Sequence, residues 1–199
     1  MKMNVINETS VRVLRTAAAL SALALLLAGC VVTSVYPFYT EKDLVSDPAF
    51  LGEWAETSSN ATPGEYLRVE QAGDKSYIVT CFGPSKTNRW EAHLFQLKGQ
   101  LFVDTCATNR SLDSVPTHQL SKVLHLESGL ETADLNYDWL AQLLENNPRA
   151  LRHLVLHDQP GDKGRIVLTA DTAELQRFVL KHLNDTNAWE SPSELKQRP

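Results

Sequence analysis

The chain has 199 residues and a formal net charge of −5, with 43% hydrophobic and 22% charged residues. These ordinary values predict one globular domain of moderate size. An acidic chain without a basic stripe argues against a nucleic-acid partner, because phosphate neutralisation supplies most of that affinity. It also disfavours electrostatic adhesion to an anionic membrane, so any membrane attachment must be hydrophobic or covalent.

Residues 1–29 have the pattern of an export signal. Lys2, Arg12 and Arg15 give a basic start, and an apolar run follows from Thr16 to Ala28. The run is shorter than the roughly 20 apolar residues of a transmembrane helix. We therefore expect a signal peptide, cleaved from the mature protein.

The end of this segment is more specific. Leu27-Ala28-Gly29-Cys30 resembles the lipobox of bacterial lipoproteins. The resemblance implies that Cys30 becomes the acylated N-terminus, held in the membrane by its acyl chains. Val31 replaces the aspartate that retains family members at the inner membrane, which implies the periplasmic face of an outer membrane. A simple secretory signal followed by a chance cysteine is the alternative.

Four regions are expected along the chain: a cleaved signal peptide (1–29), a lipidated neck (30–48), a β-rich globular domain (49–187) and a polar tail (188–199). Residues 190–199 of the tail are expected to be loosely ordered. The neck carries Tyr36, Phe38 and Tyr39. Leaving three aromatic side chains in water would lose the large favourable free energy of burying them. The neck is therefore expected to dock on the domain or to lie at the lipid surface.

Alternating hydrophobicity and intervening turn residues predict an antiparallel meander. The expected strands span 66–71, 76–82, 89–97, 100–106 and 118–126, with a further hairpin from 151–157 and 165–170. Helical periodicity predicts helices at 136–147 and 171–185, the second opening with Asp171 and Glu174 as a capping box. The fold class is α+β: a mostly antiparallel β meander, as a sheet or a partly open barrel, with two helices in the C-terminal half.

Gly52-Glu53-Trp54 resembles the G-x-W signature of lipocalin-like barrels, in which the tryptophan plugs the closed end. Only the Gly and the Trp carry this resemblance. Tyr36-Pro37-Phe38-Tyr39 together with this G-x-W also resembles uncharacterised bacterial lipoproteins, which implies a cell-envelope location. Trp54 and Trp90 are the candidate ligand-binding residues, and a purely structural core position is the alternative for Trp54.

Cys81 and Cys106 form the candidate disulfide, because an oxidising compartment favours pairing of the two remaining cysteines. Both lie at predicted strand ends with one strand between them, and two strand spacings exceed the roughly 7 Å limit on Cα separation. The bridge would require the strand ends to curl or a different pairing.

Catalytic and metal chemistry have little support. His153 and His157 share a face in either a helix or a strand, but a strand separates them by about 13 Å. Asp104 is expected to be exposed at a strand end, with a buried carboxylate as the alternative. No cofactor, metal or catalytic residue is predicted.

Three hypotheses follow. The first is a lipid-anchored, non-enzymatic module that binds an envelope protein or a small apolar ligand. The second is an envelope hydrolase acting on glycan or lipid, which convergence of Asp104 with a histidine would favour. The third is a passive structural lipoprotein.

Overall fold

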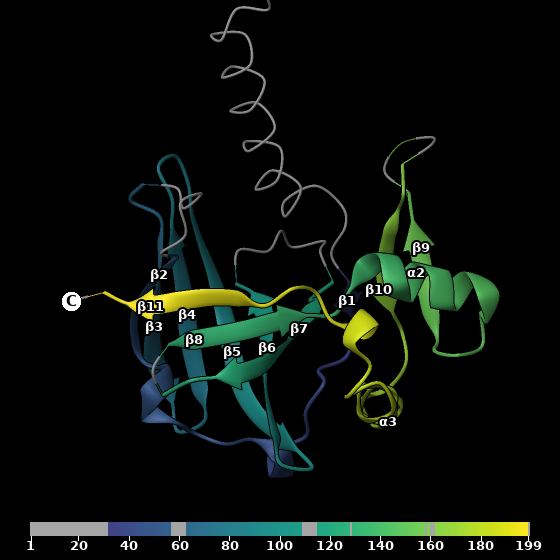
Figure 1. The fold of residues 1–199 in the computed structure, drawn as a ribbon, viewed down its shortest axis with the longest axis horizontal. Helices are drawn as coiled ribbons and strands as arrows, with labels where there is room; N and C mark the ends of the chain where they lie inside the picture. The colour runs from purple at the N-terminus through teal and green to yellow at the C-terminus, as the bar shows by residue number, and fades with distance from the viewer. Residues whose placement is uncertain are drawn as a thin grey trace, which may run out of the picture.

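Eight antiparallel strands close into a barrel (Figure 1). The computed structural model describes residues 32–56, 63–108, 115–127, 129–157, 159 and 162–198. The strands are β2 (Gly52–Glu56), β3 (Tyr66–Gly73), β4 (Ser76–Phe82), β5 (Thr87–Leu97), β6 (Gln100–Ala107), β7 (His118–His125), β8 (Leu130–Asp134) and β11 (Ser193–Gln197). From β2 to β8 each strand pairs with its successor, and β11 closes the barrel between β8 and β2.

Local turn chemistry fixes the register of the central hairpin. Lys98 and Gly99 both have positive φ, 47° and 84°, and they join β5 to β6 as a two-residue turn. Turns of this kind match the right-handed twist of the flanking strands. At the barrel seam, Gly52 begins β2 with a φ of 126°, a conformation that favours glycine.

One end of the barrel is filled by apolar side chains. Trp54 is 3% exposed, and its indole Nε1 donates to the carbonyl of Phe50 at 3.1 Å. Phe50 belongs to the short 3-10 helix η2 (Pro48–Phe50), which lies just before β2. The other buried members of this cluster are Val69, Tyr77, Val79, Ala92, Leu94, Val103, Val123, Leu126 and Leu130.

A second layer is inserted between β8 and β11. It contains α2 (Tyr137–Asn146), β9 (His153–Leu156), β10 (Arg165–Leu168), α3 (Thr172–Lys181) and the 3-10 helix η3 (Thr186–Ala188). The side chains of Asn136 and Asp171 cap the two helices, accepting from Trp139 N and Glu174 N at 2.9 Å. None of the described helices is long and apolar enough to cross a membrane.

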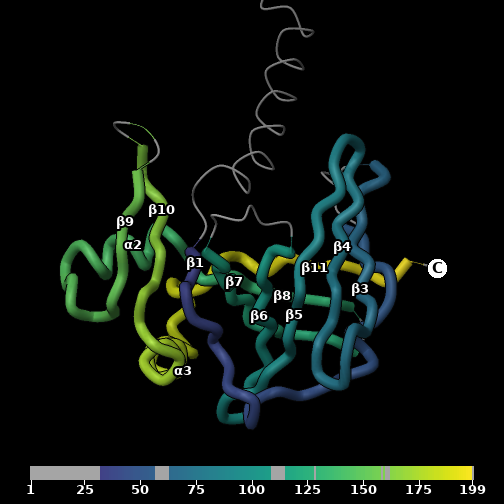
Figure 2. Tube along the Cα trace, turned by 180° about the vertical axis from the view of Figure 1, so that it is seen from behind, coloured from purple at the N-terminus to yellow at the C-terminus, as the bar shows by residue number. Residues whose placement is uncertain are grey.

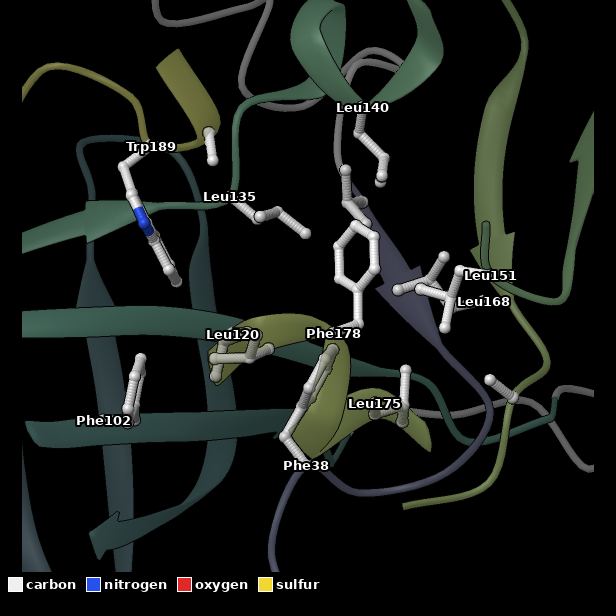
Figure 3. Close-up of a cluster of buried hydrophobic side chains, with 14 of the residues drawn as sticks. Phe38, Phe102, Leu120, Leu135, Leu140, Leu151, Leu168, Leu175, Phe178 and Trp189 are labelled. Carbon is white, nitrogen blue, oxygen red and sulfur yellow. The ribbon is translucent and has the colours of Figure 1, made fainter. Parts of the chain in front are cut away.

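The second layer packs against the outer wall of the barrel. Phe102 and Leu120 extend from that wall, and Leu140, Leu175 and Phe178 face them from the helices (Figure 3). The short strand β1 (Thr33–Ser34) joins the layers, because it pairs with β7 of the barrel and with β10 of the insertion. The 3-10 helix η1 (Glu41–Asp43) follows it in the neck.

The structure confirms an α+β fold of mostly antiparallel strands with two helices in the C-terminal half. The signal peptide, Cys30 and Val31 lie outside the described residues. Three barrel strands, β2, β8 and β11, are not among the predicted runs. The expectation of a loosely ordered segment over 190–199 was wrong, because Ser193–Gln197 is a barrel strand. Its polar composition reflects a strand whose side chains are largely exposed while its backbone bonds to β2 and β8.

The role of β11 can be tested by introducing serine on its two faces. Leu195 packs against the cluster inside the barrel, whereas Lys196 is exposed. Leu195→Ser should lower the free energy of unfolding by about 2 kcal/mol, because a half-buried apolar side chain is lost. Lys196→Ser should change it by less than about 0.5 kcal/mol. Urea denaturation measures both, and equal effects would contradict a packed closing strand.

Candidate functional site

The neck, as far as the structure describes it (residues 32–48), is built into the fold. Thr33 and Ser34 pair in parallel with Val167 and Leu168 of β10, and Ser34 also pairs with His118 of β7. From β1 the chain runs along the outside of the barrel to η1 and η2 (Figure 2). Along this path Val45 N donates to the carbonyl of Leu94 at 3.0 Å. The neck therefore docks on the domain, as its aromatic content predicts.

Helix α3 holds the middle of the neck. Thr172 Oγ1 donates to the carbonyl of Pro37 at 2.8 Å, and Gln176 Nε2 donates to the carbonyl of Phe38 at 3.0 Å. Phe38 is 2% exposed, whereas Tyr36 is 48% exposed. The neck thus bridges the barrel and the inserted layer.

Asp104 is the buried anchor of this contact. The side chain is 1% exposed; its Oδ2 accepts from Phe38 N at 3.0 Å, and its Oδ1 lies 2.7 Å from His118 Nδ1. The expectation that Asp104 is exposed was wrong, because β6 continues to Ala107 and the neck covers this face of the strand. A buried carboxylate is costly unless hydrogen bonds satisfy it, and here both oxygens have partners.

Tyr39 and His93 extend this polar cluster. Their rings lie 4.7 Å apart between centroids, and Tyr39 Oη lies 3.1 Å from His93 Nδ1. Burial raises the pKa of Tyr39, and the charge of Asp104 raises it further. The phenol therefore stays protonated and available to donate to His93, which pairs across the strands with Asp104.

A histidine oriented by a buried carboxylate is also an acid–base arrangement found in hydrolases. Cys106 is the cross-strand partner of His118 and lies on the same face as Asp104. One oxygen of Asp104, however, is bound by the backbone of the neck. The Asp104–His118 pair thus lies beneath the docked neck, and its carboxylate holds the neck backbone in place.

The two candidate tryptophans lie on the inner face of the barrel. Trp54 belongs to the packed end, and its ring nitrogen is satisfied by Phe50. Trp90 is half-buried on β5, and its cross-strand partners are Val79 and Ala107. Ligand binding by either side chain stays a prediction.

Cys81 and Cys106 are not joined by a disulfide bond. Cys81 pairs with Asn88 of β5, whereas Cys106 pairs with Glu91 of the same strand. Residues 88 and 91 of one strand lie on opposite faces, so the two cysteines also lie on opposite faces of the wall with β5 between them. The candidate disulfide does not form in this fold.

His153 and His157, the two histidines considered for a metal site, have separate partners. His153 Nδ1 lies 2.9 Å from the carbonyl of Leu151, and His157 Nδ1 lies 2.8 Å from Asp162 Oδ1. Within the described ranges, no three His, Cys, Asp or Glu side chains are grouped to hold a metal ion.

A cleft of about 310 Å³ lies between α2, the turn after it and α3. Its lining includes the apolar side chains of Leu143, Ala150, Leu151 and Phe178, and the basic side chains of Arg149, Arg152, Arg177 and Lys181. Nothing in the sequence pattern identified it. Arg177 and Lys181 are four residues apart on one helix, but only tertiary packing brings the 149–152 turn beside them.

His182 lines this cleft and packs against Trp139 and Phe178, with ring centroids 4.9 Å and 4.8 Å away. Burial lowers the pKa of His182, and the positive charge of Lys181 lowers it further. The imidazole is therefore neutral at pH 7, and the fixed charge of the cleft comes from its lysine and arginines.

Comparison with protein-family models, curated proteins and solved structures finds no match for this chain.

The importance of the Asp104 contact can be tested with Asp104→Asn, which preserves the side-chain shape and removes the charge. The free energy of unfolding should fall by about 2 kcal/mol, because charge-assisted hydrogen bonds are weakened in a buried site. Limited proteolysis should then cut within residues 32–48 more rapidly.

Asp138→Asn is the matched control. It removes an exposed carboxylate whose ion pair with Lys163 lies at the surface, and such pairs contribute at most about 1 kcal/mol. Equal stability and equal neck proteolysis in the two variants would contradict a structural role for Asp104.

Proposed function

We propose that this chain is a lipid-anchored protein of the bacterial cell envelope, whose barrel domain is a non-enzymatic binding module held against the membrane. The observation that carries the proposal is the incorporation of the neck into the fold, beginning at Val32 and β1. Cys30 is two residues earlier, and two residues span at most about 7 Å. A lipid on Cys30 would therefore hold the body directly at the bilayer rather than on a long tether.

An exposed apolar hairpin supports the same orientation. Leu154, Val155 and Leu156 of β9 are 55%, 44% and 42% exposed, on the outermost strand of the inserted layer. Neighbouring apolar side chains left in solvent are typical of a contact surface. Because β1 runs parallel to β10, the chain enters the fold from the end at which the β9–β10 hairpin turns (Figures 1 and 2). A lipid on Cys30 would bring this hairpin to the membrane surface.

The barrel supports the binding role. Closed barrels of eight strands hold side chains or one small ligand in the interior. Trp54 occupies the first barrel strand and fills one end, which resembles the lipocalin-like arrangement implied by G-x-W. The 58-residue stretch inserted before β11 departs from a simple eight-stranded lipocalin and offers a second surface for a partner. An envelope protein or a small apolar ligand is the proposed partner.

An envelope hydrolase acting on glycan or lipid is the second candidate. The distance of 2.7 Å between Asp104 and His118 is the specific observation in its favour. The two functions make different demands on Asp104: a hydrolase needs it to orient a histidine, whereas a neck contact needs it for stability. The hydrogen bond from Phe38 N to this carboxylate favours the structural role of Asp104 in the neck contact. The remaining hypothesis, a passive envelope-structural role, requires no ligand at all.

Anchoring can be tested with Cys30→Ser in the full chain. If Cys30 carries the lipid, the variant should lose acylation, detected by mass spectrometry or by labelling with a fatty-acid analogue. It should also leave the outer-membrane fraction on cell fractionation. Cys81→Ser is the matched control, because it removes a thiol from β4 and should leave the distribution unchanged. Unchanged acylation and fractionation of Cys30→Ser would refute the anchor.

The orientation of the body can be tested separately by fluorescence quenching. Val155→Trp in the purified lipidated protein, reconstituted in vesicles that contain brominated phosphatidylcholine, should add emission that the bromine quenches. Leu124→Trp is the control, because Leu124 is also exposed and apolar. It lies six residues along β7 from His118, about 20 Å from β1. Equal quenching at the two positions would contradict the proposed orientation.

A further inference from the structure

The cleft between α2 and α3 concentrates positive charge in an acidic protein. The chain has a formal net charge of −5, yet Arg149, Arg152, Arg177 and Lys181 all line this one cleft. Glu174 is the acidic residue in the same described lining. Clustered charge of one sign in a concave site raises the local concentration of ions of the opposite sign.

Among the residues that the structure describes, only one of these cations, Arg152, is neutralised by nearby carboxylates. Arg152 Nη2 lies 2.8 Å from Glu174 Oε2 and 3.2 Å from Asp171 Oδ2. The ion pairs found among the described residues do not include Arg149, Arg177 or Lys181. Arg152 thus connects the turn to α3. Arg177 donates from Nε to the carbonyl of Ala173 at 3.3 Å, which leaves its terminal guanidinium nitrogens, together with Arg149 and Lys181, available to an anion.

Helix stability explains only part of this arrangement. Lys181 is in the last turn of α3, where a cation interacts favourably with the helix dipole. Arg177 is one turn earlier, and like charges four residues apart on a helix destabilise it slightly. Arg149 comes from a different segment and adds a third charge to the same cleft. A bound anion would relieve the mutual repulsion of all three.

The floor of the cleft is apolar. Leu151 and Phe178 are buried core residues, and Leu143 packs against the same core (Figure 3 shows Leu151 and Phe178). A volume of about 310 Å³ is at the lower end of the range for small-molecule sites, about 300–1,000 Å³. Inorganic phosphate alone would leave the apolar floor uncovered, whereas a neutral apolar molecule would leave the cations without a partner.

We infer that this cleft binds a small organic anion, which places a phosphate or carboxylate group between Arg149, Arg177 and Lys181 and an apolar group against Leu143 and Phe178. Arginine suits this role, because its planar guanidinium binds carboxylate and phosphate oxygens through two parallel hydrogen bonds. The inference deepens the proposed binding module by naming a ligand class, and it does not depend on the lipid anchor.

Phenyl phosphate is the probe, because it carries both features and stays monomeric in solution. The full chain, purified in a neutral detergent, is titrated by calorimetry with phenyl phosphate, inorganic phosphate and benzyl alcohol. Phenyl phosphate should bind with a Kd of about 1 mM or lower, and the other two about tenfold more weakly. Arg177→Ala/Lys181→Ala should weaken phenyl phosphate binding about tenfold or more, because charge-assisted hydrogen bonds are lost.

Lys75→Ala/Lys86→Ala is the matched control. It removes the same charge from exposed positions outside the cleft and should change the Kd less than twofold. Arg149→Ala, in the turn after α2, is a second cleft variant that leaves α3 intact. Absence of phenyl phosphate binding, or equal Kd values in the cleft and control variants, would overturn the inference. Fractionation of Cys30→Ser judges the anchor by a different measurement, so the two failures are distinguishable.

Discussion

The buried carboxylate of Asp104 is the constraint on which the arrangement of this protein depends. It joins three segments that are distant in sequence: the neck at Phe38, strand β6, and the start of β7 at His118. A buried charge of this kind stabilises a fold only when its partners are in place, so it specifies one position for the neck rather than many. With the neck fixed, β1 can pair with both β7 and β10. The inserted layer thereby acquires a defined place beside the barrel, and so do its apolar hairpin and its basic cleft.

The two hydrophobic clusters have different tasks. The cluster around Trp54 fills one end of the barrel interior, and the cluster around Leu140 and Phe178 joins the barrel wall to the helices. Strands β5 and β6 contribute to both, because successive side chains of a strand point to opposite faces. Both faces are therefore apolar where Leu94 and Phe95 of β5 pair with Val103 and Phe102 of β6, whereas the outer face of β5 is polar nearer the start of the strand. The same two strands thus line the barrel interior and form the outer surface that the inserted layer covers.

Much of the fold was predictable from local signals, whereas the sites were not. Period-two runs, the Lys98-Gly99 turn and the Asp171 cap identified most strands and α3, because these signals depend on nearby residues. Strand β11 is polar, and it forms a strand because its backbone pairs with β2 and β8. The pattern of its own sequence does not predict this pairing. The separation of the cysteines could have been deduced: the turn lengths place Cys81 opposite residue 88 and Cys106 opposite residue 91, an odd offset along β5. The burial of Asp104 and the grouping of Arg149 with Arg177 arise only from tertiary packing.

The position of the closing strand also determines when the barrel can be completed. Trp54 and Gln197 are direct neighbours across the seam, although almost the whole domain separates them in sequence. Contacts of such large sequence separation form late and slow the folding of all-β topologies. The strands β2 and β8 therefore keep open edges until residues 193–197 have been synthesised and can pair with them. Exposed strand edges promote association between chains. A barrel that is completed by a strand so far along the chain from β2 has a period of vulnerability before that strand is synthesised, when escorting factors would be most useful.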